Sequence, residues 1–480
     1  MILTVDAGKC GIRQLQKKEY VSVEEAEASL AYHFEAAVEL KTEGIKLIIA
    51  QTGLGKTNTY LHYLLHAKQR FLIAVPTHKL IREIYEKAQS IGVGNIVCMP
   101  EMPELSDELR EDISHLYHIG AGQISLKRLR LMFAGMKSDH PDYSRLKDFF
   151  HKLDAADSFD GHILMTHERF LYLHEDSPLL KNRTVIIDED ILNTAFSTIT
   201  VSCDDIKKGL TMDFFGEKEK SRMREILNGD MYQRYHTKAG VYLIEEDLPK
   251  QFDEIETNIL DLLNAKVLVK YDNAVTFIKA KPFPTYQVII MSATANPELY
   301  RWLMYVPIEV FKCKQARYMG TLRQYTNSSY SRKKLINDQN QEDLIQKVKS
   351  IIGEQNVITF QCCENVFHTK YHYGAIEGLN ALEGQDIAVI GLPNTDEKVY
   401  KLYGMLIGVD PYKESWKYKR IQYNGYEFYL NTFSNYRLRT IQLWMIESHL
   451  EQAVGRARLL RHPCNVTVFA RFPIDQAEIV

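Results

Sequence analysis

Short apolar runs recur along the chain, and each of them ends in a polar or glycine-containing turn. Runs of about five β-prone residues indicate strands that are buried on both faces, as in a parallel sheet. In the first part of the chain such runs cover residues 47–50, 71–75, 162–166, 184–187 and 287–291. A second set covers residues 356–360, 386–391 and 465–469. The pattern predicts an α/β fold with two parallel-sheet cores in tandem.

Apolar residues at helical spacing predict two helices beside these runs. Residues 23–43 carry one apolar stripe, formed by Ala26, Leu30, Phe34, Ala37 and Leu40. Residues 440–450 carry another, which includes Ile441, Trp444 and Met445. The first helix leads into the strand at 47–50, and the second leads into an arginine-rich turn.

The spacing of the predicted strands divides the chain into three parts. We expect a first core over residues 1–311, a link and entry to the second core over 312–345, and the second core over 346–480. Residues 91–160 and 200–275 fit the alternation of strands and helices poorly. We therefore expect mainly helical insertions in these two places.

Three basic segments each have two interpretations. Residues 127–130 either contact nucleic acid or form a solvated helix face. The charged insertion at 200–275 either clamps nucleic acid or offers an accessory interaction surface. The stretch 312–345, in which basic residues alternate with tyrosines, either lies along a single strand or is a solvated linker.

Composition excludes few functions. With 59 basic and 62 acidic residues, the formal net charge is −3. No overall basic field indicates nucleic acid, although a local groove can still be basic. The 7 cysteines are scattered, which fits a reduced chain. No apolar run approaches the roughly 18 residues that a membrane span needs, so we expect a cytoplasmic protein that is not inserted in a membrane.

The turn after residues 47–50 predicts a phosphate-binding loop. Gly53 and Gly55 let the backbone curl so that its N–H groups face inward, and Lys56 adds a charge for the β- and γ-phosphates of a nucleotide. Thr57 can then hold Mg²⁺ through its hydroxyl. The predicted nucleotide contacts are Gln51, Thr52, Gly53, Leu54, Gly55, Lys56 and Thr57.

Two carboxylates follow the buried run at 184–187. Asp188 and Glu189 lie at the carboxyl end of a predicted parallel strand, which is where a nucleotide binds in such sheets. We expect Asp188 to hold Mg²⁺ through water, and Glu189 to orient or deprotonate the attacking water. The alternative is an ordinary acidic turn, and the phosphate loop upstream argues against it.

The arginine-rich turn follows the second predicted helix. A helix packed on the second core could aim Gln452 and Arg456 at a nucleotide that the first core holds. Such an arginine stabilises the charge on the transferring phosphoryl group. Arg458 is the candidate for a second arginine of this kind. A basic surface helix is the alternative.

The order of these motifs resembles that of superfamily 2 DExD/H-box helicases, over roughly residues 45–475. The loop is similar to their A-x-x-G-x-G-K-T form, and 188–191 resembles their acidic box, with Asp190 in place of Ala and Ile191 in place of Asp or His. The resemblance implies two tandem RecA-like cores. The segment around Gly378 and the arginine-rich turn look closest to the iron–sulfur branch, but the first insertion holds only Cys98, so no cluster is expected.

The resemblance also implies residues that contact nucleic acid or couple it to the nucleotide. They are Pro76, Thr77, His78, Thr166, His167, Ser292, Thr294, Gly378 and Asn380. Simpler roles exist for some of them: Pro-Thr is common at helix starts, and a histidine at a strand end such as His167 often caps or packs.

Together these inferences predict a helicase or translocase that acts on nucleic acid and uses ATP and Mg²⁺. The branch that the chain resembles favours DNA over RNA, as a single strand or a tailed duplex, and replication, repair or defence proteins are expected partners. Two alternatives stay open: an ATP-dependent remodeller of protein–nucleic-acid complexes that does not unwind, and a non-catalytic recruitment module. A P-loop kinase fits less well, because it would leave the second core without a role.

Overall fold

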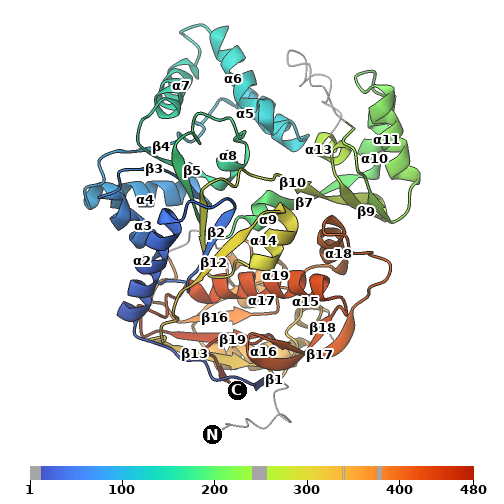
Figure 1. Cartoon of the computed structure of the whole chain (residues 1–480). Helices are drawn as coiled ribbons and strands as arrows, with labels where there is room; N and C mark the ends of the chain where they lie inside the picture. Colours follow the sequence, from blue (N-terminus) through green and yellow to red (C-terminus); the bar gives the residue numbers. More distant parts are fainter. Residues whose placement is uncertain (1–11, 240–256, 338, 340, 376–380) are drawn as a thin grey trace.

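Within the described residues, the first core is built on a seven-stranded parallel sheet (Figure 1). The computed structural model describes residues 12–239, 257–337, 339, 341–375 and 381–480. The strand order is β12-β2-β11-β6-β3-β5-β4. The strands are β2 (Ile45–Ile49), β3 (Arg70–Val75), β4 (Ile96–Cys98), β5 (His162–Thr166), β6 (Arg183–Asp188), β11 (Val288–Ser292) and β12 (Ile308–Lys312). Five of them confirm predicted strands, and the two edge strands, β4 and β12, were not predicted.

Helices cover both faces of this sheet. On one face α2 (Val23–Glu39), α3 (Lys56–Leu64) and α4 (His78–Ser90) share one hydrophobic cluster with the strands. On the other face lie α8 (His167–Leu171), α9 (Leu192–Ala195) and α14 (Pro297–Met304). This double cover explains why the strands are apolar without alternation. α2 confirms the helix predicted at 23–43 and ends four residues earlier than expected.

The first insertion is helical, as predicted. It consists of α5 (Asp107–His118), η1 (Gly122–Ile124), α6 (Ser125–Ala134) and α7 (Tyr143–Asp157). The basic segment at 127–130 lies on α6, where Arg128 pairs with Asp112 at 3.3 Å and Arg130 with Asp154 at 2.5 Å. These pairs favour a helix face that is tied to its neighbours.

The second insertion contains a sheet that the sequence analysis did not predict. In its described residues, which leave out 240–256, this sheet has four antiparallel strands in the order β7-β10-β9-β8. They are β7 (Phe196–Ser202), β8 (Tyr232–Arg234), β9 (Val267–Tyr271) and β10 (Ala274–Ala280). The expected helices are α10 (Cys203–Thr211), α11 (Glu217–Asn228) and α13 (Ile259–Leu263). The insertion expected as mainly helical at 200–275 therefore combines helices with a sheet in its described residues.

The second core has a six-stranded parallel sheet in the part of the chain that the structure describes, in the order β15-β14-β16-β19-β13-β20. Its strands are β13 (Thr321–Tyr325), β14 (Asn356–Thr359), β15 (Tyr371–His372), β16 (Ile387–Ile390), β19 (Asn465–Phe469) and β20 (Glu478–Ile479). Because β13 pairs with β19 and β20, this core begins within the segment expected as a link and entry.

Six helical segments accompany this second sheet. They are α15 (Arg332–Ile336), α16 (Gln341–Ile352), η2 (Gln361–Cys363), α17 (Glu364–Phe367), α18 (Glu397–Leu406) and α19 (Tyr436–Gly455). α19 confirms the helix predicted at 440–450. None of the described helices combines the length and apolar character that a membrane span requires.

A small antiparallel sheet joins the beginning of the chain to the second core. β1 (Ile12–Gln14) pairs with β18 (Tyr426–Thr432), which forms a hairpin with β17 (Lys417–Tyr423). In the register of this sheet, Ile12 lies opposite Phe428. Residues 12–14, which we expected in the first core, therefore belong to a sheet of the second.

The two cores also meet through the second insertion. Tyr403 of α18 donates a hydrogen bond to Phe196 O, and Arg234 donates one of 2.5 Å to Met405 O. One hydrophobic cluster continues from the first sheet through the insertion into α18 and α19. The cores are thus joined by packed side chains as well as by the connecting chain.

Candidate functional site: a pocket between the two cores

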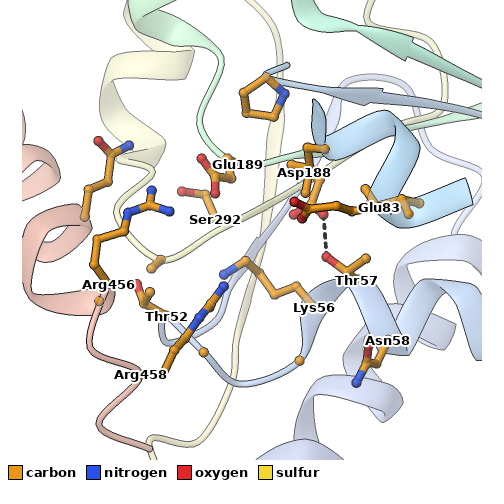
Figure 2. A pocket seen from close by; sticks show the side chains of 18 of the residues that line it. Thr52, Lys56, Thr57, Asn58, Glu83, Asp188, Glu189, Ser292, Arg456 and Arg458 are labelled. Atoms are coloured by element: carbon orange, nitrogen blue, oxygen red, sulfur yellow. Dashed lines mark hydrogen bonds between the residues drawn. The ribbon is translucent and has the colours of Figure 1, made fainter. Parts of the chain in front are cut away.

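A pocket of about 460 Å³ lies where the two cores face each other (Figure 2). The first core lines it with the loop after β2 and with the turns after β3, β6 and β11. The second core lines it with the end of α19 and the turn that follows. The pocket therefore collects the carboxyl ends of parallel strands, where open α/β sheets bind ligands.

The loop between β2 and α3 has the backbone of a phosphate cradle. Gly53 and Gly55 have φ angles of 82° and 93°, in the left-handed region that favours glycine. α3 begins at Lys56, so the unpaired N–H groups of its first turn and the lysine charge act on the same spot. Desolvation lowers the pKa of Lys56, while Asp188 and Glu189 oppose that shift.

Two predicted loop residues hold the loop in place and do not line the pocket. Gln51 Oε1 accepts a hydrogen bond of 2.9 Å from Ala316 N, in the segment between the cores. Leu54 is fully buried in the cluster under α2 and α3. Thr52, Gly53, Gly55, Lys56 and Thr57 do line the pocket, and their contact with a nucleotide stays a prediction.

Thr57 and Asp188 are already assembled as a pair. Thr57 Oγ1 donates a hydrogen bond of 2.8 Å to Asp188 Oδ2, at the end of β6. Tyr60 donates a second one of 3.0 Å to the same oxygen. A hydroxyl and a carboxylate side by side are hard oxygen ligands of the kind that Mg²⁺ takes, so these residues fit the ion. Tyr60 was not among the predicted site residues. It follows Thr57 by three residues, so the two side chains lie on one face of α3.

Glu189 has a backbone conformation that residues other than glycine rarely adopt. Its φ angle is 78°, and its N–H donates a hydrogen bond of 3.0 Å to Met291 O. A residue other than glycine pays about 1–2 kcal/mol for this conformation, and such strain gathers at functional sites. Glu189 lines the pocket together with Lys56 and Arg456 (Figure 2).

Asp190, the third residue of the acidic turn, faces the second core. Its Oδ1 accepts a hydrogen bond of 2.6 Å from the Tyr300 hydroxyl, and its Oδ2 accepts one of 3.1 Å from Trp444 Nε1 on α19. Desolvation raises the pKa of Asp190. From the sequence, Asp190 was identified only as a departure from the acidic box of the family, and no contact was predicted for it. Ile191, beside it, is fully buried.

The second core brings its arginines to the phosphate loop. The predicted residues Gln452, Arg456 and Arg458 line the pocket, and so does Gly455, which was not predicted. Gly455 lies so close to the loop that an added Cβ would be 2.4 Å from Thr52 Cγ2. Arg458 has a φ of 58°, and its positive charge is close enough to Lys56 to contribute to the lowering of the pKa of that lysine. Figure 2 shows both arginine side chains directed into the pocket from the end of α19.

Residues expected from the family resemblance shape the turns around the pocket. Pro76, Thr77, Ser292 and Thr294 line it. Thr77 caps α4 by accepting a hydrogen bond of 3.2 Å from Leu80 N. Ser292 Oγ accepts hydrogen bonds of 3.2 Å from the N–H groups of Thr294 and Ala295. The hydroxyls of Thr77 and Ser292 are therefore engaged in local caps.

His167 is a packing residue in this structure. It is 3% exposed, and its Nε2–H donates a hydrogen bond of 3.0 Å to Asp188 O. Burial lowers the pKa of His167 to about 4, so the ring is neutral near pH 7. Its role is to support the strand end that carries Asp188, in agreement with the simpler of its two expected roles. Gly378 and Asn380 lie outside the described residues.

A second hollow, of about 620 Å³, lies at the ends of β3 and β5 between the two insertions. His78 and Thr166 line it. The hollow also has cations and aromatic rings, among them Tyr117, Phe149, Arg169, Tyr172, Lys279 and Lys281. Lys281 Nζ lies 4.3 Å from the centre of the Tyr172 ring. Charged and aromatic groups together suit a ligand with phosphates and bases.

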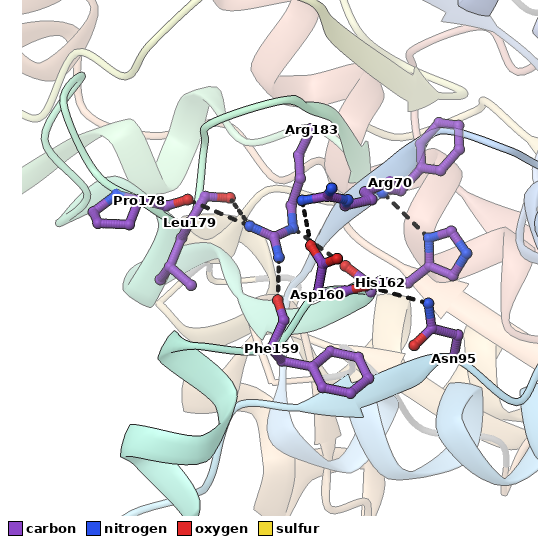
Figure 3. Close-up of polar contacts among 10 residues, drawn as sticks. Arg70, Asn95, Phe159, Asp160, His162, Pro178, Leu179 and Arg183 are labelled. Atoms are coloured by element: carbon purple, nitrogen blue, oxygen red, sulfur yellow. Dashed lines mark hydrogen bonds and ion pairs between the residues drawn. The ribbon is translucent and has the colours of Figure 1, made fainter.

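At the opposite end of the same strands a polar cluster has a structural role (Figure 3). Arg183 donates hydrogen bonds to the carbonyl oxygens of Phe159, Gly161, Pro178 and Leu179. Beside it Arg70 pairs with Asp160. The Arg183 guanidinium is thus fully engaged by backbone carbonyl groups, and its role is structural. The candidate functional site lies at the other end of the strands, the carboxyl end.

Comparison with known proteins agrees with the resemblance in the sequence. Residues 33–133, which include the phosphate loop, match the DEAD/DEAH box helicase family. No curated protein matches the chain.

The solved structures that are similar to this chain include the following three. The first is Xpd4 of S. tokodaii, with 13% identity over 95% of this chain and 100% of that one, and a TM-score of 0.49. Mss116p bound to ssRNA and AMP-PNP has 10% identity over 95% and 76%, with a TM-score of 0.35. A DEAD box protein from Methanococcus jannaschii has 11% identity over 95% and 93%, with a TM-score of 0.23.

Proposed function

We propose that this chain, which matches the DEAD/DEAH box helicase family over residues 33–133, is a nucleic-acid-dependent ATPase that translocates along nucleic acid and unwinds it. One observation carries the proposal. Lys56 and Asp188 of the first core line the same pocket as Arg456 of the second core. A site divided between two cores can convert nucleotide turnover into relative movement of those cores.

The phosphates of ATP would bind at the loop after β2. The curled backbone at Gly53 and Gly55 and the first turn of α3 present N–H groups, and Lys56 adds a positive charge. Thr57 and Asp188 are the residues that would hold Mg²⁺. When bound, the ion would neutralise part of the phosphate charge.

Hydrolysis would use one residue from each core. Glu189 is the candidate to orient the attacking water and accept its proton. Arg456 is the candidate to stabilise charge on the transferring phosphoryl group, a role worth roughly 10³–10⁵ in turnover for related enzymes. Gln452 and Arg458 would complete the second core's side of the pocket. Release of phosphate would remove the charge that draws Arg456 toward the loop, and the cores could then separate.

The nucleic acid would run through the hollow between the two insertions. Arg169 would face its phosphates, together with Lys279 and Lys281, which pair with Asp261 and Glu168 in this structure. Tyr117 and Tyr172 offer rings on which bases stack. This path begins at the ends of β3 and β5, in the sheet whose other strands carry the phosphate loop and Asp188. Single-stranded or tailed DNA is the proposed substrate, and RNA is the competing one.

Turnover of ATP by the purified chain tests the proposal. Wild-type protein should hydrolyse ATP with Mg²⁺, and single-stranded DNA should accelerate it more than RNA of the same sequence. Lys56→Ala should abolish turnover, whereas Lys347→Ala, at an exposed position of α16, should not change it. Equal, near-zero rates for wild type and Lys56→Ala would refute the proposal.

Unwinding of 5′-tailed and 3′-tailed duplexes separates the remaining possibilities. Strand separation that needs ATP supports a helicase. ATPase activity that nucleic acid stimulates, without strand separation, identifies a translocase or remodeller. Binding of nucleic acid without any hydrolysis identifies a recruitment module.

A further inference from the structure

Asp190 connects the two cores by a hydrogen bond. Its carboxylate accepts hydrogen bonds from Leu192 N at 3.1 Å and from the Tyr300 hydroxyl at 2.6 Å, both within the first core. It accepts a third from Trp444 Nε1 at 3.1 Å, across the interface. One side chain thus ties the acidic turn to a helix of the other core.

Trp444 lies on the helix that delivers the arginines. α19 runs from Tyr436 to Gly455, and Gln452 and Arg456 follow Trp444 by eight and twelve residues. At 1.5 Å per residue they lie about 12 and 18 Å farther along the helix axis. α19 therefore contacts the first core along its length: at its start, where Tyr436 donates a hydrogen bond to Glu298, in its middle at Asp190, and at its end, where Gly455 approaches Thr52.

The surroundings of this hydrogen bond are apolar. Trp444 is 1% exposed and Tyr300 is fully buried. Both belong to the hydrophobic cluster that also holds Leu438, Ile441 and Met445 of α19. In such a setting the Trp444 indole N–H has no water to replace a lost partner, whereas Asp190 is half-buried and also lines the pocket between the cores. The hydrogen bond between Asp190 and Trp444 is therefore costly to break. α19 would rotate about this contact more easily than it would move away from it.

In the first core, the Asp190–Trp444 hydrogen bond lies next to Glu189, the residue that would activate water. Asp190 follows Glu189 directly, and Glu189 has the strained φ of 78°. The side chain of Asp190 is fixed on both of its oxygens, so the peptide that links it to Glu189 has little freedom. If α19 rotated about Trp444, the movement would pass to Glu189 through Asp190 and the peptide bond that joins these two residues. It would pass to Arg456 through the helix itself.

We propose that Asp190 and Trp444 form the pivot that couples movement of the second core to the orientation of Glu189 and Arg456. This inference rests on the proposed ATPase function. Trp444 is a positioning residue, because it does not line the pocket. Asp190 lines the pocket, and the role proposed for it here acts through its hydrogen bond to Trp444. Nucleic acid that draws the cores together would act on turnover through this pair.

The competing explanation is that Trp444 only fills space in the apolar cluster. Trp444→Phe separates the two explanations, because it removes the indole N–H and keeps an aromatic ring. Tyr300→Phe is the matched control. It removes a donor to the same carboxylate, but that bond lies within the first core.

Turnover of ATP by these variants, with and without single-stranded DNA, tests the pivot. Trp444→Phe should lower the stimulated kcat about tenfold while the KM for ATP and the unstimulated rate stay near wild type. Asp190→Asn should lower the stimulated kcat in the same way, and the stimulated kcat of the double variant should be no lower than that of either single one. Tyr300→Phe should keep the wild-type ratio of stimulated to unstimulated turnover.

Each failure has a distinct meaning. Wild-type protein without ATPase activity refutes the proposed function itself. Active wild type with unchanged stimulation in Trp444→Phe and Asp190→Asn refutes the pivot alone, as does equal loss of stimulation in Tyr300→Phe. Near-UV circular dichroism establishes that each variant is folded, and if Trp444→Phe is not, Asp190→Asn decides the question.

Discussion

Gly455 and Thr52 touch across the interface between the two cores: a Cβ atom added at Gly455 would lie 2.4 Å from Thr52 Cγ2. This contact gives a physical reason for glycine in the Gln-x-x-Gly-Arg turn. Gly455 ends α19 and its φ is not in the left-handed region, so the backbone itself would accept alanine. Only the approach of the phosphate loop forbids a side chain there.

Gly455→Ala should therefore lower ATP turnover without unfolding the protein. The new methyl group would push the end of α19 away from the loop by about 1 Å, a displacement that can cost about a hundredfold in rate. Gly94→Ala is the control, because nothing lies within 4 Å of an added Cβ there. Wild-type turnover in Gly455→Ala, at an unchanged melting temperature, would contradict the close contact.

Arg456 and Arg458 should differ in what their loss does to kinetics. Arg456→Ala should reduce kcat about a thousandfold with little change in nucleotide affinity, because its charge acts on the transferring group. Arg458 lies beside Lys56 and the loop, so Arg458→Ala should mainly weaken nucleotide binding. Single-turnover rates and nucleotide titrations separate the two effects. The opposite pattern would exchange their roles.

Tyr60 should affect the dependence of turnover on Mg²⁺. Its hydroxyl donates to the same oxygen of Asp188 that Thr57 uses, so it orients the carboxylate that would hold the ion. Tyr60→Phe should raise the Mg²⁺ concentration for half-maximal turnover about tenfold. Tyr63→Phe, on the same helix but without this bond, is the control. An identical Mg²⁺ dependence in wild type and Tyr60→Phe would remove Tyr60 from the site.

Acid should destabilise the first core through His167. Burial lowers the pKa of His167 from 6.5 to about 4, so the unfolded chain binds a proton in a pH range where the folded one does not. The stability that this group contributes is present above pH 6.5 and is lost as pH falls toward 4. Between pH 7 and pH 5 the loss is about 2 kcal/mol.

Urea unfolding at pH 7 and pH 5 measures this loss. His167→Gln should show a smaller fall in unfolding free energy, by about 2 kcal/mol, because glutamine does not titrate. His162, whose pKa burial also lowers to about 4, is retained in both proteins and cancels in the comparison. An equal fall in both proteins would show that His167 is not the titrating group.

Local sequence carried the prediction of the main sheets and of the nucleotide loop. Strands such as Phe71–Val75 are apolar throughout because helices cover both faces of the sheet, and this signal lies within one segment. The same is true of Gly53, Gly55 and Lys56, whose conformations depend on neighbours in the chain. The helix that carries Trp444 and the turn with Arg456 were likewise predicted from local spacing.

Features that depend on distant partners were not predicted. β4 is only three residues long and is identified by its pairing with β5. The sheet of the second insertion is made of strands that are separated by charged helices. Asp190 looked like an anomaly in a motif, because its partner Trp444 lies 254 positions away. No local pattern encodes such a pair.

The pairing of β1 with β18 sets an order of events during synthesis. Ile12 emerges from the ribosome early, and its partner Phe428 follows 416 residues later (428 − 12). At about 5–20 residues per second, this strand waits roughly 20–80 s for its partner. The first core therefore has time to form before the hairpin exists, and β1 joins the second core only after β17 and β18 have been made.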